Sequence, residues 1–479
     1  MNLSSSRFGL LLFVLTVNAC GSSQATTSAD AGDASQESEA PDTDSPKADA
    51  RDEMPPEADT SDGNCVPSST DDPDDDGIDD NCDGADGVVG HDIYVTTKGF
   101  KTNDGTPWEP LDSLVGAIAL AQTRPGARVF LARGIYEESP LKVTSDIQIF
   151  GGYEESFLGR PDRDVTTLRA PTGLLVQAKG AHLSFSHLTI QGLDAGKSGQ
   201  ASSYGLRILA GDVSIDDVVV VSGDAASGAS GEKGADGQTP TTAIAAPIKC
   251  NNVVQDIVSA GTTQCPAVNG GAGQPGRDGE NGGTALRIEC GFLEDPRVAQ
   301  SGQVGYPGTG GSSCASVAAG SGGCPGGFGT GGTGGGSSVS VLALVGSFSA
   351  TRSVIRTGLG GAGGDGGQGG AGAPGPTVTA QTGGNGGKGG DGGGGAGGST
   401  IGVLHSTFAN IDVDPTTSYE IAPAGPGGRG RGGANAPSGK RLPVLESSMQ
   451  YRTEYAPCEL DRNCCDGLAC EDNECRSSP

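Results

Sequence analysis

The sequence predicts an all-β fold in which a repeated scaffold carries long glycine-rich loops. Gly211 and Gly223 in one strand-like stretch match Gly346 and Gly358 in a later stretch. Each glycine and its match are 135 residues apart. Glycine blocks with a period of three, such as residues 360–370, follow these stretches. A fixed offset is typical of stacked repeats, each of which buries its apolar residues against its neighbours.

The composition excludes long helices and a bulky core. Of the 479 residues, 86 are glycine and only 4% are aromatic. Glycine loses the most backbone freedom on folding and has no side chain to pack, so the core must lie in the Val, Ile and Leu segments. The net charge is −28, and residues 30–86 carry −19 of it. So acidic a chain disfavours nucleic acid as a partner, because that binding would need a basic face.

The N-terminus predicts export. Arg7 precedes an apolar run over residues 8–17, which suits a signal peptide and is too short to span a bilayer. Residues 17–21, Val-Asn-Ala-Cys-Gly, resemble the lipobox of bacterial lipoproteins, although Asn18 departs from the usual small residue. The resemblance implies a signal peptide over residues 1–20, acylation of Cys20, and the membrane as a partner at the bacterial outer membrane or cell surface. An ordinary secreted protein is the alternative.

Residues 21–64 are rich in Ser, Ala, Asp, Glu and Pro. Such a segment has too few apolar residues to bury, and its like charges repel one another. We therefore expect a disordered acidic tether that holds the rest of the chain away from the membrane.

A calcium-type loop follows the tether, within residues 65–87. Carboxylates at positions 1, 3 and 5, a glycine at 6 and a carboxylate at 12 can surround one hard cation. The order of residues 72–83, with Gly77 at position 6 and Cys82 at position 11, resembles a thrombospondin type 3 repeat. The resemblance implies calcium, and an acidic linker is the alternative. The expected ligands are Asp72, Asp74, Asp76, Ile78 through its carbonyl, Asp80 and Asp83.

From residue 91 the chain changes to short apolar segments. Residues 93–95 predict a strand, and Leu111, Leu114, Val115 and Ile118 recur at the spacing of an amphipathic helix of about three turns. Ile149, Leu168 and Ile190 follow one another at intervals that suit one repeat. Further strands are expected at residues 128–132, 134–137, 147–153, 167–168, 174–176, 183–190, 206–208, 213–221, 285–288, 339–355 and 401–413.

This succession resembles the right-handed parallel β-helix of the pectin-lyase-like superfamily. The match rests on Asp104-Gly105-Thr106, the helix from Leu114 to Ala121, residues 132–136 and Gly151-Gly152-Tyr153. The resemblance implies a β-helix over residues 91–445 with an N-terminal capping helix, which would cover a bare strand edge. A β-propeller is the rival, but it needs four antiparallel strands in each blade.

The glycine-rich inserts lie at about residues 223–283, 300–337, 358–399 and 425–434. These runs are too short for a collagen triple helix, which also requires three chains. Two interpretations stay open. The blocks are either solvated loops or a bundle of extended, polyglycine-II-like strands with three residues per turn. They also resemble the glycine-rich tracts of mycobacterial PGRS surface proteins.

Thirteen cysteines in an exported chain predict disulfides rather than zinc ligands. The expected pairs are Cys65 with Cys82, Cys250 with Cys265, and Cys314 with Cys324. Residues 458–475 hold five more cysteines and resemble a small knot-like module. By parity, Cys290 is expected to bond to this module.

Two classes of function remain. The scaffold suggests a structural or adhesive display protein that binds glycan, matrix or other cells. The fold resemblance suggests a polysaccharide lyase or glycoside hydrolase, which needs clustered carboxylates and, for a lyase, a basic residue. Asp216, Asp217 and Arg207 are the candidates for that chemistry. However, the residues that match Asp212, Asp216 and Asp217 one offset later are Ser347, Thr351 and Arg352, so we expect the carboxylates not to stack. We favour display.

Overall fold

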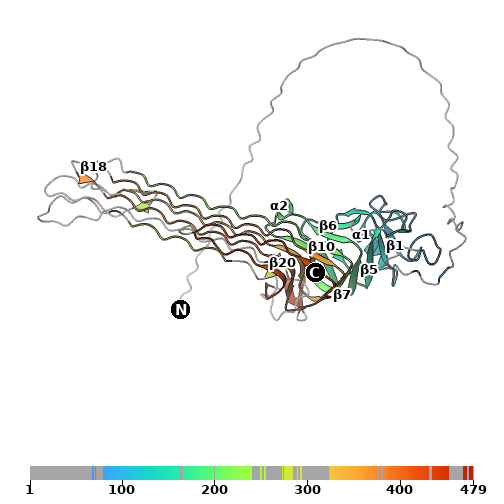
Figure 1. Ribbon diagram of the computed structural model, residues 1–479. Coiled ribbons are helices and arrows are strands. Elements are labelled where there is room, and N and C mark those ends of the chain that lie inside the picture. The colour runs from blue at the N-terminus through green and yellow to red at the C-terminus, as the bar shows by residue number, and fades with distance from the viewer. Residues whose placement is uncertain are drawn as a thin grey trace, which may run out of the picture. The chain divides into compact units, whose positions relative to one another are not determined.

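The protein is described here from a computed structural model (Figure 1). It describes residues 67–68, 71, 79–160, 165–198, 200–239, 249–250, 253–254, 272, 274–283, 288–289, 292–293, 323–375, 377–378, 381–382, 384–430, 434–451, 468–471 and 474–477. Cys20, the tether and residues 72–78 of the calcium-type loop lie outside these residues, as do Cys65, Cys265, Cys290 and Cys314. Among the described residues, no helix is long and apolar enough to cross a membrane.

The fold is rich in β-structure and is dominated by two parallel sheets. The eleven-stranded sheet contains β1 (Ile93–Val95), β2 (Val129–Ala132), β4 (Leu141–Lys142), β5 (Ile147–Tyr153), β7 (Leu174–Ser186), β9 (Ser203–Asp216), β15 (Ser338–Ala343), β16 (Gly346–Thr351), β20 (Thr400–Ser406), β21 (Ala409–Val413) and β23 (Arg441–Ser447). The six-stranded sheet contains β3 (Gly134–Tyr136), β6 (Thr166–Ala170), β8 (Thr189–Gly192), β10 (Val219–Val221), β17 (Val354–Arg356) and β22 (Ser418–Glu420).

The chain passes repeatedly from the eleven-stranded sheet to the six-stranded sheet and back. Each passage places a new strand beside the preceding one in parallel register. Leu168, Ile190, Val220, Ile355 and Tyr419 are aligned in this way across the six-stranded sheet. The predicted interval between Leu168 and Ile190 is therefore one repeat.

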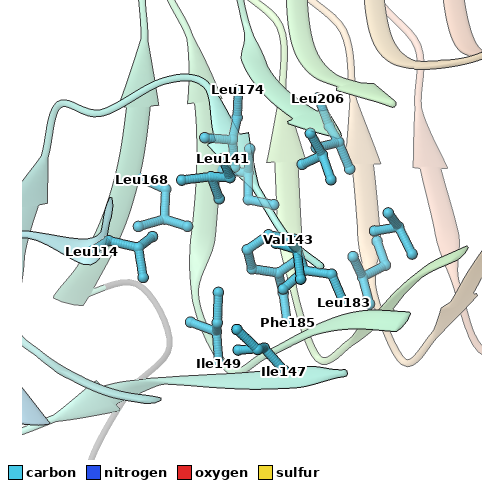
Figure 2. Packing of buried hydrophobic residues seen from close by; sticks show 14 of the residues in the cluster. Leu114, Leu141, Val143, Ile147, Ile149, Leu168, Leu174, Leu183, Phe185 and Leu206 are labelled. Carbon is cyan, nitrogen blue, oxygen red and sulfur yellow. The ribbon is translucent and has the colours of Figure 1, made fainter. Parts of the chain in front are cut away.

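The predicted interval between Ile149 and Leu168 is not a repeat, because Ile149 lies in the eleven-stranded sheet and is aligned with Phe185. Inward residues of both sheets form one buried cluster, which includes Ile149, Leu168, Phe185 and Leu206 (Figure 2).

A helix packs against the first strands. Helix α1 (Leu114–Ala121) buries Leu114, Ala117, Ile118 and Ala121. Its N-cap is Ser113, whose hydroxyl accepts a hydrogen bond from the Gly116 amide. Glu138 accepts hydrogen bonds from the amides of Leu114 and Val115. The helix is shorter than predicted, because Leu111 instead forms a bridge with Val95. Val115 lies within the helix but faces solvent rather than the core. The loop from Gly105 to Leu111 thus covers the open edge of β1.

One predicted strand does not belong to the main sheets. Residues 285–288 were expected to resume the stack, but β13 (Ile288–Glu289) pairs with β14 (Phe292–Leu293) and β24 (Met449–Tyr451) in a separate sheet. The remaining small elements are the hairpins β11 (Lys249–Cys250) with β12 (Val253–Val254), β18 (Thr377–Val378) with β19 (Gln381–Thr382) and β25 (Leu468–Glu471) with β26 (Glu474–Ser477), and helix α2 (Ala195–Ser198).

The glycine blocks form a hydrogen-bonded bundle, which we call the glycine array (Figure 1). The amides of Gly228, Gly231, Gly234 and Gly237 donate to the carbonyls of residues 362, 365, 368 and 371, so every third residue bonds to the same neighbour. Of the two interpretations left open by the sequence, the structure selects the ordered one. The array segments are residues 226–237, 274–283, 323–336, 359–373, 384–398, 423–430 and 434–439.

The array keeps the register of the sheets. Val219 is aligned with Val354 at the offset that the sequence predicts, and Ala229 lies against Gly364 at the same offset. A second, shorter offset aligns Ser338 with Thr400, and it returns between Thr333 and Gly395. The predicted offset is therefore confirmed, and it governs the inserts as well as the strands.

Four consecutive glycines show why the array contains so few residues other than glycine. A Cβ atom built on Gly392, Gly393, Gly394 or Gly395 would lie 2.0, 2.0, 2.3 or 1.9 Å from a carbonyl oxygen of a neighbouring segment. Gly392 and Gly395 face the same segment, while Gly393 and Gly394 face two others. This geometry has three residues per turn and excludes any side chain where all three directions are occupied.

Polar side chains close the surface of the array. Where the third residue of a triplet faces solvent, it is often Asp or Thr, and its side chain accepts an amide hydrogen from the next segment. Asp236 accepts from Ala371, Asp365 from Arg429, and Thr333 from Ala229. These contacts satisfy backbone donors that would otherwise form an open edge.

We expect Gly364→Ala to destabilise the array, because its Cβ would lie 1.9 Å from the Ala229 carbonyl oxygen. The expected cost is about 1–3 kcal/mol, typical of overpacking. Amide hydrogen exchange in peptides covering residues 226–237 and 359–373 measures it. Gln368→Ala, at an exposed third position, is the matched control. Equal exchange in the two variants would contradict the close-packed geometry.

Candidate metal centre

The segment from Asp79 to Asp92 lies against the face of β1, β2 and β5 that points away from the main core. Ile93 and Val95 point into that core, whereas Tyr94 belongs to a separate cluster with Phe130, Tyr153 and Phe157. We call this the aromatic cluster. Ala85 is part of it and Val89 packs against it. The alternation of β1 thus turns one face to the stack and the other to an acidic segment.

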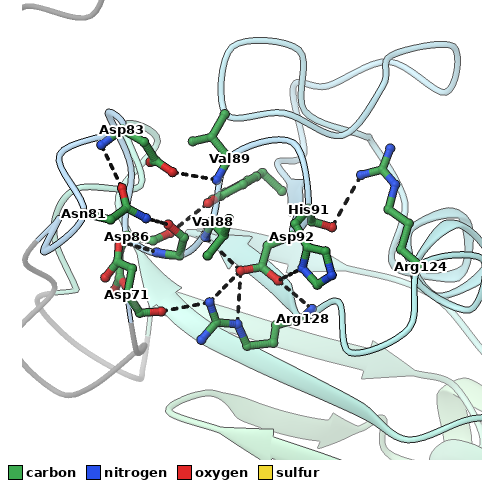
Figure 3. Close-up of polar contacts among 12 residues, drawn as sticks. Asp71, Asn81, Asp83, Asp86, Val88, Val89, His91, Asp92, Arg124 and Arg128 are labelled. Carbon is green, nitrogen blue, oxygen red and sulfur yellow. Dashed lines mark hydrogen bonds and ion pairs between the residues drawn. The ribbon is translucent and has the colours of Figure 1, made fainter. Parts of the chain in front are cut away.

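Three carboxylates come together in this segment. One ligand oxygen from each of Asp71, Asp79 and Asp83 lies within 4.8 Å of the others. Asp79 accepts hydrogen bonds from the amides of Asp83 and Gly84, at 3.0 and 2.7 Å. Asp71 accepts from the amide of Gly87, at 3.0 Å. The carboxylate of Asp83 accepts from the amide of Val89, at 2.9 Å. Backbone amides therefore position all three carboxylates; Figure 3 shows Asp71 and Asp83.

Two carboxylate oxygens of this cluster, Oδ1 of Asp71 and Oδ1 of Asp83, are buried and have no hydrogen-bond partner among the described residues. Asp71 is only 1% exposed. A buried acceptor left without a donor costs free energy, and more so when it is charged. Unpartnered oxygens on carboxylates that come together in this way fit a hard cation such as calcium, which takes oxygen ligands.

The electrostatics of the cluster agree with this fit. Burial raises the pKa of Asp71 to about 7, with a further contribution from the charge of Asp86. Burial also raises the pKa of Asp83 above its usual range. Both carboxyls are thus poorly stabilised as anions by the protein alone, and a bound cation would favour their charged forms.

The observed cluster overlaps only partly with the ligands expected from the sequence. Asp83 is common to both, whereas Asp80 is exposed and lies outside the cluster. Asp72, Asp74, Asp76 and Ile78 lie outside the described residues. Sequence reasoning missed Asp71, which precedes the loop, and Asp79.

A signal for Asp79 was present in the sequence. Asp79, Asn81 and Asp83 alternate along the chain. Asn81 and Asp79 both accept the amide hydrogen of Asp83, so the alternating residues form one compact turn.

Three described cysteines are disulfide-bonded: Cys82, Cys324 and Cys475. The partners expected for Cys82 and Cys324 lie outside the described residues, and Cys250 is described only as part of β11. Cys82 has a φ of 62° and stands inside the acidic segment. Its disulfide restrains the turn that carries Asp79 and Asp83.

The candidate catalytic residues do not form one site. Asp216 is paired with Arg352, with Nη2 and Oδ2 2.5 Å apart, and Asp217 with His187, with Oδ2 and Nδ1 2.7 Å apart. Burial raises the pKa of Asp216, but hydrogen bonds from Arg352 and Thr351 outweigh it and leave the pKa below its usual value.

Arg207 lies in the part of β9 that pairs with β15, whereas Asp216 lies in the part that pairs with β16. Its side chain is buried and stacks on Tyr204, with 5.5 Å between the guanidinium carbon and the ring centroid. Burial lowers its pKa to about 10. Arg207 is therefore not placed to act as a base beside Asp216 and Asp217.

The prediction that the carboxylates do not stack is confirmed. Asp212 is aligned with Ser347, and Asp216 with Thr351. The two pairs are hydrogen-bonded, with the serine and threonine hydroxyls donating to the carboxylates.

No protein family, curated protein or solved structure matches this chain.

Calcium is expected to raise the melting temperature of the protein, since a ligand that binds only the folded state stabilises it. At a concentration 100 times the dissociation constant the gain is about 2.7 kcal/mol. Asp71→Asn and Asp83→Asn should each remove most of this gain, and Asp80→Asn should not. Thermal unfolding with calcium or a chelator measures the effect. A gain that all three variants keep would rule out this cluster.

Proposed function

We propose that this chain is a cell-surface display scaffold. Its two parallel sheets form a right-handed parallel β-helix, and the glycine array is a rigid extension that presents a binding surface to glycan, matrix or other cells. The proposal rests on one observation: the sheets and the array share a register. The offset that aligns Val219 with Val354 and the offset that aligns Ser338 with Thr400 both recur in the array.

The β-helix is supported by the way the chain alternates between the two sheets. Consecutive strands of each sheet are parallel and one repeat apart, as in Leu168 and Ile190. Crossover connections between parallel strands are right-handed in nearly all proteins, because of the twist of the strands. A coil that alternates between two sheets in this way has the architecture of the pectin-lyase-like superfamily.

The array suits presentation better than catalysis. Its inward positions are glycines in contact with neighbouring backbone, and its third positions carry the exposed side chains, such as Gln368 and Lys388. Backbone bonds at every third residue oppose bending of single segments. An arm of this kind offers a wide, stiff surface of small polar groups, which suits contact with a polymer or a matrix.

The N-terminal parts complete the proposal. Cys20 carries the lipid anchor, residues 21–64 form the tether, and calcium bound at Asp71, Asp79 and Asp83 stiffens the calcium-type loop of residues 65–87. The orphaned oxygens of Asp71 and Asp83 support the cation. The lipoprotein resemblance implies several acyl chains on Cys20, and more than one chain is needed for a stable anchor.

A glycan-cleaving enzyme on the same fold is the second candidate. It is favoured by the gathering of polar groups at one corner, where Asp216 forms an ion pair with Arg352 and Asp217 a hydrogen bond with His187. Those contacts, together with the separation and burial of Arg207, argue for a structural role at this corner.

Binding without cleavage is the expected result when the purified protein is applied to an array of glycans and matrix proteins. Gly364→Ala should weaken binding while the melting of the body is retained, and Gln368→Ala provides the packing control. The same glycans are then assayed for new reducing ends and for the ultraviolet absorbance of unsaturated sugars. Cleavage that Asp216→Asn abolishes would replace display with catalysis.

Replacement of the lipidated cysteine tests the anchor. Cys20→Ser should release the protein from the membrane fraction into the medium and abolish incorporation of labelled fatty acid, because the acyl chains supply the membrane affinity. Cys82→Ser, which removes a disulfide instead, should leave labelling intact. Retention of the label in Cys20→Ser would exclude this cysteine as the anchor.

A further inference from the structure

The acidic segment is joined to the aromatic cluster by buried hydrogen bonds through Asp86. The hydroxyl of Tyr153 donates to Oδ2 of Asp86 at 2.6 Å, and the hydroxyl of Tyr94 donates to its carbonyl at 2.9 Å. The amide of Asp86 donates to the carbonyl of Phe157. Asp86 itself is 1% exposed. The segment is therefore docked on the body rather than attached as an independent module.

A second junction runs through Arg128, which begins the approach to β2. Its guanidinium forms two hydrogen bonds with Oδ2 of Asp92, at 3.0 and 2.6 Å, and a third with the carbonyl of Asp71, at 2.9 Å. The Asp92 side chain is fully buried. Arg128 also lies over the ring of Phe130, 5.5 Å from its centroid. The Arg128 side chain thus connects Asp71 to the aromatic cluster. Figure 3 shows its bonds to Asp71 and Asp92.

The three carboxylates and the aromatic cluster are packed too closely to move independently of each other. Gly87 has a φ of +96°, and a Cβ atom there would lie 2.7 Å from the ring of Phe130. The amide of the same glycine donates to Asp71. A shift of Asp71 away from the other carboxylates would therefore pull directly on the residue seated against Phe130.

We propose that the cation acts as a latch, which closes residues 79–92 over the aromatic cluster and so controls the order of β1, β2 and β5. The inference rests on the calcium site proposed above. Three carboxylates within 4.8 Å repel one another when charged, and a cation converts this repulsion into attraction. Without the cation the segment opens, Asp86 leaves Tyr94 and Tyr153, and the aromatic cluster is exposed to water.

Reciprocity supplies the test, because two coupled sites change each other's free energies by the same amount. Tyr153→Phe removes a hydrogen bond of the closed segment without touching Asp71, Asp79 or Asp83. It should weaken calcium binding, measured by calorimetry on the full mature chain, by about tenfold, since a hydrogen bond to a charged group is lost. Tyr136→Phe is the matched control. Its hydroxyl also donates to buried carbonyls, those of Val95 and Ala132, but on the inner side of β1 and β2.

Hydrogen exchange gives a second readout that does not depend on the variants. A chelator should accelerate amide exchange by more than tenfold in peptides covering Ile93–Val95, Val129–Ala132 and Ile147–Tyr153, and leave Thr400–Ser406 unchanged. Calcium binding with unchanged exchange, or with equal affinity in Tyr153→Phe and wild type, would overturn the latch and leave the calcium site standing. Absence of calcium binding in calorimetry would remove both.

Discussion

Backbone hydrogen bonding in a fixed register between parallel segments is the constraint on which the rest of the structure depends. In the sheets, the register aligns aliphatic side chains such as Leu168, Ile190 and Val220, which bury one another. In the array, the same register brings backbones so close that only glycine fits at Gly364 or Gly395. One geometric rule thus produces a side-chain core in one region and a core of backbone in the other.

Polar side chains lie where these two kinds of packing meet and at the turns between the sheets. Where the returning array segments join β15 and β20, Ser202, Ser337 and Ser399 form a hydroxyl ladder in which the amide of each later serine donates to the hydroxyl of the one before. In the turns between the sheets, His187, Asp217 and Arg352 adopt positive φ values at successive repeats. His187 forms a hydrogen bond with Asp217, and Arg352 an ion pair with Asp216. These contacts hold turns in place, which explains why candidate catalytic residues gather there without forming a catalytic arrangement.

The sequence predicted the two parts of this architecture with unequal success. The main offset was visible because Gly211 and Gly346 occupy a left-handed conformation in matching strands, and such positions favour glycine. Leu111 was assigned to the helix because its spacing fits, but a bridge to Val95 competes more strongly than one more helical turn. Residues 285–288 were assigned to the stack on local pattern, although a strand joins the neighbour that its register meets in space, here β24.

By itself, the sequence determined the all-β class, the repeat, the period of three in the glycine blocks and the acidity of residues 30–86. These properties are local, since they follow from residue type and spacing along the chain. Only the tertiary structure decided that the glycine blocks are ordered, that Asp71 and Asp79 join Asp83, and that Arg207 is buried toward the other end of β9 from Asp216. Each of these depends on which segments are neighbours in space, because hydrogen-bond partners and the desolvation of charges are set by the packing of distant parts of the chain.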